Sequence, residues 1–205
     1  MSASERAYRH VKDRILDGTL PGGELISEGE IAEALEMSRT PVRAAFGQLE
    51  AEGLLRLYPK RGALVVPVSA SETEAVMETR WVIERYAIER VIERPGDVPE
   101  ALAASVRAQH GLEGREFVEA DREFHRTLVA GTGNEILLAL YDSLRDRQRR
   151  MAHATARTVG TRERSIREHG ELADALAAGD GELALSVLRR HLDGALATIR
   201  GRGYG

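Results

Sequence analysis

Residues 37–55 read MSRTPVRAAFGQLEAEGLL, and this stretch decides how the N-terminal part of the chain folds. Its apolar residues recur at helical spacing and form one face, made of Val42, Ala45, Phe46 and Leu49. Thr40 precedes Pro41, and these residue types are typical of an N-cap and of the first turn of a helix. These features alone predict an ordinary capped helix that packs in a core.

Two arginines at the start of this helix, Arg39 and Arg43, need a further explanation. They lie four residues apart at the N-terminal end, where the helix dipole disfavours positive charge. Arginine pairs bidentately with phosphate oxygens and guanine edges, and recognition helices read bases with their N-terminal residues. We therefore predict a DNA-reading surface formed by Ser38, Arg39, Thr40 and Arg43. The alternative is a capped core helix and nothing more.

The elements around this helix predict a winged helix-turn-helix over residues 1–68. Helical patterns cover 5–17 and 27–37, and LLRLYPKRGALVVPV at 54–68 reads as a small hairpin. The tip of this hairpin is basic and consists of Lys60, Arg61 and Gly62. We expect the tip to contact phosphates or the minor groove of DNA.

From residue 71 onward the sequence predicts helices and no strand. The expected helices, separated by glycine and proline, cover 71–94, 99–110, 115–130, 134–157, 161–178 and 181–200. Helices of this number and length form a compact bundle. The predicted fold class is therefore mainly α, with an N-terminal winged helix-turn-helix and a C-terminal all-α helical bundle over residues 71–205.

The composition excludes several kinds of protein. The chain has 205 residues, a net charge of −4 and no cysteine, which rules out disulfides, cysteine nucleophiles and cysteine-ligated zinc. It lacks a signal-peptide core and the run of about 20 apolar residues that a membrane helix needs. We expect a cytoplasmic protein with no membrane partner, in which any DNA binding comes from local charge.

Four side chains of the helical domain form a candidate metal site. Asp121 and His125 lie four residues apart, hence on one face of one helix. His169 and His191 lie on the last two predicted helices. Three histidines and an aspartate suit a divalent ion such as Zn, Ni, Mn or Fe. The alternative is that these histidines are structural or exposed, since other histidines of the chain have no obvious partner.

The N-terminal motifs resemble a known family. MSRTPVRAAFGQLEAEGLL followed by YPKRGALVVPV is similar to the DNA-binding domain of the GntR family of bacterial transcription regulators, over about residues 5–68. Two positions depart from the family pattern. Gly29 stands where many relatives carry a DNA-contacting arginine, which implies a weaker or altered operator contact. Glu36 stands where the turn usually has glycine, which implies a negative charge near the DNA.

The C-terminal segments resemble the all-helical FCD ligand-binding domain of FadR-type members of this family, in the shorter VanR-like branch. These segments are RWVIE (80–84), DREFHRTLVAGTGNEIL (121–137), REHGELADALAAGD (167–180) and RRHL (189–192). The resemblance implies a divalent metal ion held by Asp121, His125, His169 and His191.

The same resemblance implies that a small carboxylate effector meets the open coordination positions of the metal. It also implies that Arg80 lines the effector pocket, where its guanidinium would pair with a carboxylate. The alternative for Arg80 is an exposed salt bridge with Glu84, four residues further along the helix.

Together with the resemblance, these patterns predict a ligand-responsive transcription regulator and not an enzyme, and we assign no catalytic residue. We expect a homodimer that binds a palindromic double-stranded operator, acts as a repressor, and changes its DNA affinity when a small organic acid binds. One alternative is a metal-dependent hydrolase or lyase with a DNA-binding appendage, which turnover of carboxylates would support. Another is a DNA-binding protein whose bundle only dimerises.

Overall fold

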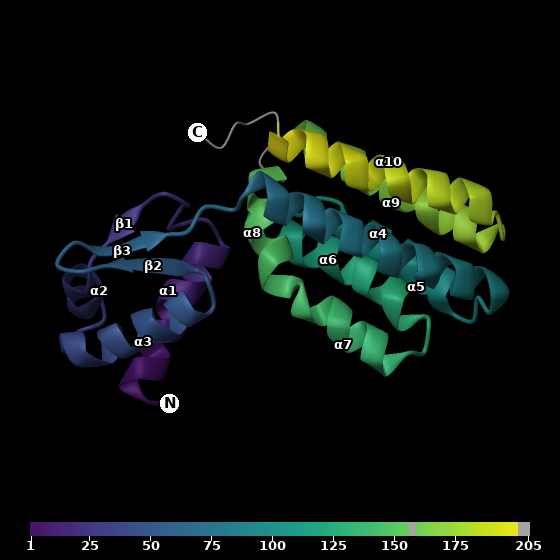
Figure 1. The fold of residues 1–205 in the computed structure, drawn as a ribbon. Coiled ribbons are helices and arrows are strands. Elements are labelled where there is room, and N and C mark those ends of the chain that lie inside the picture. Colours follow the sequence, from purple (N-terminus) through teal and green to yellow (C-terminus); the bar gives the residue numbers. More distant parts are fainter. Residues whose placement is uncertain (156–158, 201–205) are drawn as a thin grey trace. The chain divides into compact units, whose positions relative to one another are not determined.

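A computed structural model of the chain describes residues 1–155 and 159–200 and divides into two compact units (Figure 1). The units are Met1–Val68 and Ser69–Gly205. Each has its own set of buried apolar side chains.

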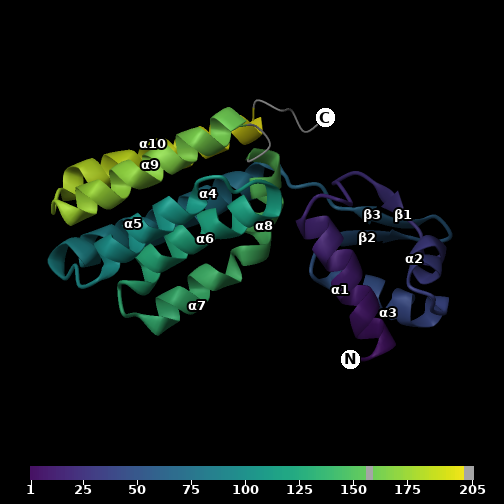
Figure 2. The ribbon, with the colours of Figure 1, turned by 180° about the vertical axis from the view of Figure 1, so that it is seen from behind.

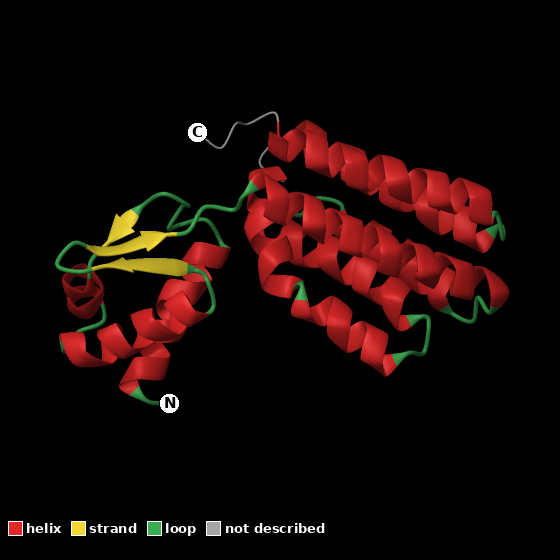
Figure 3. Cartoon of the chain, viewed as in Figure 1, coloured by secondary structure: helices red, strands yellow, loops and turns green. Residues whose placement is uncertain are grey.

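The first unit combines three helices with a small antiparallel sheet, whose strands are the yellow arrows of Figure 3. Its elements are α1 (Ala3–Leu16), β1 (Leu25–Ile26), α2 (Glu28–Ala34), α3 (Arg39–Ala51), β2 (Leu55–Tyr58) and β3 (Gly62–Val65). β3 lies between β1 and β2, with Leu57 opposite Ala63. The apolar face of α3 enters the core, where Phe46 and Leu49 are buried. The predicted winged helix-turn-helix is confirmed.

Three local details of this unit differ from the sequence prediction. α3 begins at Arg39 with Ser38 as its N-cap, so the assignment of Thr40 as N-cap is wrong; Pro41 still lies in the first turn, where a missing N–H breaks no helical bond. α2 ends at Ala34, earlier than predicted, because Glu36 has a left-handed φ of 51°. The pattern does not predict β1, because two residues are too few for a recognisable alternation.

In the part of the second unit that the structure describes, every element is a helix, as predicted. The helices are α4 (Ala70–Glu93), α5 (Val98–Gln109), α6 (Gly114–Ala130), α7 (Glu135–Ser143), α8 (Arg145–Thr155), α9 (Val159–Ala177) and α10 (Gly181–Arg200). Figures 1 and 2 show α9 and α10 side by side along one edge of the bundle, and α10 also packs on α4. The mainly α fold class is confirmed.

The single helix expected over 134–157 is two helices, α7 and α8, which meet at Leu144. Glycine and proline are missing from the sequence at this point, so the break has no local signal. α7 and α8 both pack against α4 and α6, and α8 also packs against α10. Residues 156–157 of the expected helix lie outside the described residues.

None of the helices in residues 1–155 and 159–200 combines the length and the apolar character needed to cross a membrane.

Candidate functional site

The predicted DNA-contacting residues of α3 are exposed at its N-terminal end. They are Ser38, Arg39, Thr40 and Arg43. The guanidinium of Arg39 lies against α2, where a Cβ added to Gly29 would be 3.2 Å from Arg39 Nη2. The small residue at position 29 therefore leaves room for the guanidinium of Arg39 at this surface.

Arg43 is held by a bidentate ion pair with Glu28 of α2. Its Nε donates to Oε1 at 2.9 Å and its Nη2 donates to Oε2 at 2.8 Å. The hydrogen bond from Arg43 lowers the pKa of Glu28, while the Arg43 side chain remains 71% exposed. A guanidinium has five N–H donors, so a pair that uses two of them orients Arg43 and leaves it capacity for an external anion.

The tip of the hairpin presents Lys60 and Arg61 to solvent. Lys60 has a φ of 63° in the turn after Pro59, and the Arg61 N–H closes this turn by donating to the Tyr58 carbonyl at 3.0 Å. The backbone of the hairpin requires glycine at position 62. Its φ is +100°, and a Cβ there would lie 2.3 Å from the carbonyl oxygen of Ile26, so glycine is needed where β1 approaches β3.

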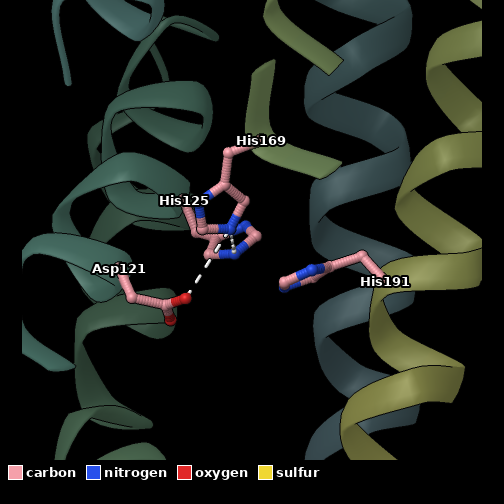
Figure 4. Close-up of side chains that lie close together, drawn as sticks. All are labelled: Asp121, His125, His169 and His191. Atoms are coloured by element: carbon pink, nitrogen blue, oxygen red, sulfur yellow. Dashed lines mark hydrogen bonds and ion pairs between the residues drawn. The ribbon is translucent and has the colours of Figure 1, made fainter. Parts of the chain in front are cut away.

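The four predicted metal ligands converge in the helical bundle (Figure 4). Asp121 and His125 project from α6, His169 from α9 and His191 from α10. One candidate ligand atom of each residue lies within 4.8 Å of the other three. His169 Nε2 is 3.2 Å from His125 Nε2 and 3.6 Å from Asp121 Oδ1. The three histidines are buried and Asp121 is half-buried.

Each histidine is oriented by a second residue at its Nδ1. His125 Nδ1 lies 2.8 Å from Glu84 Oε2. His169 Nδ1 lies 2.8 Å from Gln109 Oε1. His191 Nδ1 lies 2.9 Å from Glu168 Oε2. Such outer partners are typical of metal-binding histidines, whose tautomer and ring orientation they fix.

These outer contacts determine where the lone pairs of the rings point. A carboxylate or an amide oxygen only accepts, so each Nδ1 must carry the hydrogen and each neutral ring keeps a lone pair on Nε2. The Nε2 atoms of His125 and His169 then face each other at 3.2 Å, both as acceptors. Two lone pairs at this distance repel unless a cation or a proton lies between them.

The buried environment favours the neutral, ligand form of His125 and His169. Burial lowers the pKa of His125, and burial together with the neighbouring His191 lowers the pKa of His169 well below its ordinary value. For Glu84 burial is the largest influence and favours the neutral acid, but the charges and hydrogen bonds of Arg80 and His125 together outweigh it and lower the pKa. Neutral imidazoles beside a charged outer carboxylate are the protonation states that a metal ion needs.

The alternative for Arg80 was an exposed salt bridge with Glu84. The salt bridge is present, but both side chains are buried, so the expected exposure is wrong. The pair itself exists: Arg80 Nε donates to Glu84 Oε1 at 2.7 Å, and the Tyr141 hydroxyl donates to the same oxygen at 2.8 Å. Arg80 also lines a cavity of about 60 Å³ together with Asp121, His125 and His191. The residue therefore connects the histidine cluster with the cavity.

The residues present fit a divalent metal ion. Three imidazoles and one carboxylate form an N/O donor set, and ligand atoms around one such ion lie about 3–4 Å apart. The separations in the cluster, within 4.8 Å, come close to this value. The facing Nε2 lone pairs supply the electrostatic reason for a cation at the centre.

Sequence reasoning missed the residues that support the cluster. The sequence patterns give Gln109 and Glu168 no role, and they indicate Glu84 only as a partner of Arg80. Glu168 directly precedes His169 but contacts His191, so adjacency in sequence gives the wrong partner. Gln109 has no motif that would mark it.

Comparisons with known proteins match both units. Bacterial regulatory proteins of the gntR family match residues 3–65, and the FCD domain matches residues 75–194. A protein of Paenarthrobacter nicotinovorans named "probable D-xylose utilization operon transcriptional repressor" is 31% identical over 182 residues, which cover 87% of this chain and 80% of that protein.

Two solved structures are similar as well. One from Rhodococcus sp. RHA1, described as a GntR transcriptional regulator, has a TM-score of 0.70 at 27% identity and covers 99% of this chain and 100% of its own. The Zn²⁺-bound FCD domain of the regulator TM0439 has a TM-score of 0.54 at 25% identity and covers 65% of this chain and 96% of its own. The chain belongs to the GntR family of bacterial transcription regulators, and its helical unit is an FCD domain.

Proposed function

We propose that this regulator is a homodimeric repressor that binds a palindromic operator and senses a small carboxylate through a metal centre in its FCD domain. The observation that carries the proposal is the convergence of three histidine Nε2 lone pairs beside an arginine-lined cavity. A cation centre and an anion pocket in one place are what a carboxylate sensor requires.

The DNA-reading part of the proposal rests on the exposed basic residues of the first unit. Arg39 and Arg43 would contact bases or phosphates from the start of α3, with Ser38 and Thr40 beside them. Lys60 and Arg61, at the hairpin tip, would add contacts to phosphates or to the minor groove. In a homodimer, two such units would occupy half-sites about one turn of DNA apart.

The sensing part rests on the cluster and on Arg80. Asp121, His125, His169 and His191 would hold the divalent ion, and the ion would supply a positive centre for a carboxylate oxygen. Arg80 binds and orients the acid, because its guanidinium lines the same cavity. Glu84 fixes both Arg80 and the His125 ring, so the pocket is set before the acid arrives.

Regulation then follows from linkage between the acid and the DNA. If the acid binds more tightly to the conformation that releases DNA, it weakens operator binding by that difference in affinity, typically about 1–3 kcal/mol. The relative from Paenarthrobacter nicotinovorans is named a repressor, which supports the same sign here.

Selection of bound genomic DNA fragments, followed by binding titrations, tests the proposal. Wild-type protein should select sites that share a palindrome, and Arg43→Ala should bind them about 1–3 kcal/mol more weakly. Arg9→Ala is a matched control, because Arg9 is exposed on α1 and pairs only locally with Glu5. Selection of no common site would contradict the proposal, and turnover of a carboxylate by metal-loaded protein would favour the enzyme alternative.

A further inference from the structure

We propose that the effector carries two anionic groups, one bound at the metal and Arg80 and the other at Arg149 of α8. This makes it a short dicarboxylate and not a monocarboxylate. The inference rests on the proposed function, namely that a small organic acid binds beside the metal centre.

Arg80 and Arg149 each lie with Nε next to a carboxylate. Arg80 Nε donates to Glu84 Oε1 at 2.7 Å, and Arg149 Nε lies 3.2 Å from Glu119 Oε1. The two arginines are only 7% and 6% exposed. In each case the carboxylate lies beside the Nε of the guanidinium.

The Nη2 atoms of both arginines are buried and, within residues 1–155 and 159–200, have no hydrogen-bond partner. A buried donor without a partner destabilises the fold, and the penalty is larger for a charged group. Both arginines line the cavity that also contains Asp121, His125 and His191. An anion in this cavity would give each Nη2 the partner that the folded chain does not provide.

The charge of the cavity wall also favours a dianion. Arg122 and Arg164 line it in addition to Arg80 and Arg149, whereas Asp121 is its only lining carboxylate among the described residues. Each of these arginines pairs with a carboxylate that does not line the cavity, namely Glu84, Glu119, Asp142 or Glu168, and these pairs offset part of the charge. A divalent metal ion would add two further positive charges, which one carboxylate group cannot balance.

The size of the cavity favours a short acid. Its volume of about 60 Å³ corresponds to about four to six water molecules, at roughly 10–15 Å³ for each. This space suits an acid of about three or four carbons. Malonate and succinate are therefore suitable probes, and propionate and butyrate are their counterparts with one carboxylate.

Calorimetric titration of the Zn²⁺-loaded full-length protein with these matched pairs tests the inference. We expect each diacid to bind wild-type protein at least about tenfold more tightly than its monoacid, as for one charge-assisted contact. Arg149→Gln should remove this preference and leave the affinity for the monoacids unchanged. If Arg149→Gln folds poorly, Arg149→Lys serves as a second variant because it keeps the charge. Arg149→Lys should retain part of the preference for diacids.

Arg147→Gln is the matched control, because Arg147 lies on the same helix but is 56% exposed and pairs with Glu72. Its preference for diacids should equal that of wild type. Equal binding of monoacid and diacid to wild type, or an unchanged preference in Arg149→Gln, would overturn this inference and leave the carboxylate sensor intact. Binding of neither acid would overturn both.

Discussion

Replacing Glu84 by glutamine should destabilise the helical unit strongly, because Arg80 would remain as an unpaired buried charge. Glu84 is 0% exposed and accepts hydrogen bonds from Arg80 and Tyr141 at 2.7 and 2.8 Å. Removing one partner of a buried ion pair costs about 3–5 kcal/mol. At about 3–5 °C per kcal/mol for a domain of this size, the Tm of the metal-free protein should fall by about 9–25 °C.

A second substitution separates this mechanism from a general loss of packing. Adding Arg80→Met to Glu84→Gln removes the unpaired charge, while the glutamine oxygen still accepts from Tyr141. The double variant should therefore be more stable than Glu84→Gln alone, because an apolar replacement of a buried charge is often neutral or stabilising. The control is Glu89→Gln, which breaks an exposed pair with Arg85 on the same helix and should change stability by less than about 1 kcal/mol.

Thermal unfolding followed by circular dichroism, with a chelator present, measures these differences. A Tm of Glu84→Gln within a degree or two of wild type would refute the reasoning, and so would a double variant less stable than the single one. Glu84→Gln alone should also weaken metal binding about 10–100-fold, because Glu84 orients His125. Competition with a metal chelator measures that affinity independently of stability.

Three further predictions concern the wing, the DNA backbone and pH. Gly62→Ala should lower the free energy of unfolding of the first unit by about 1–3 kcal/mol or more, measured by urea titration, because the φ of +100° is strained for alanine and its Cβ meets the Ile26 carbonyl. The logarithm of the DNA-binding constant falls linearly with the logarithm of the salt concentration. If Lys60 contacts a phosphate, Lys60→Ala should make this slope less steep by about one. Burial lowers the pKa of His125 and His169, so the unfolded chain binds more protons below the ordinary histidine pKa of about 6.5. Their contribution to stability is present above that pH and is lost below it, so the Tm of the metal-free protein should fall on acidification from about pH 7.5 to about pH 5.5.

The sequence predicts the fold well because most of its elements have local signals. The apolar face of α3, the basic turn of the hairpin and the glycine or proline between helices are visible in the pattern. The break at Leu144 has no local signal, and the strand β1 is set by pairing, which a single sequence does not display. The backbone conformation of Glu36 is also not predicted. The resemblance implies only a negative charge near the DNA, whereas the structure shows a left-handed φ at this residue.

The candidate site is predictable only in part for the same reason. Asp121 and His125 lie four apart on one helix, which spacing reveals. His169 and His191 come from other helices, so residue type makes them candidate ligands, and the resemblance is what implies that they join the pair. The partners of their Nδ1 atoms, and the buried state of Arg80, depend on how five helices pack, so no spacing rule identifies them.

Elemental analysis of the untagged protein, purified without chelators, tests the central claim most directly. The metal centre predicts about one divalent ion per chain in the wild-type protein and its loss in His169→Ala, with the operator-binding unit still folded. Absence of metal from both proteins, even after loading with Zn²⁺, Ni²⁺ or Mn²⁺, would contradict the metal centre and the carboxylate sensor built on it. Retention of the ion in His169→Ala at wild-type affinity would contradict the assigned ligand set.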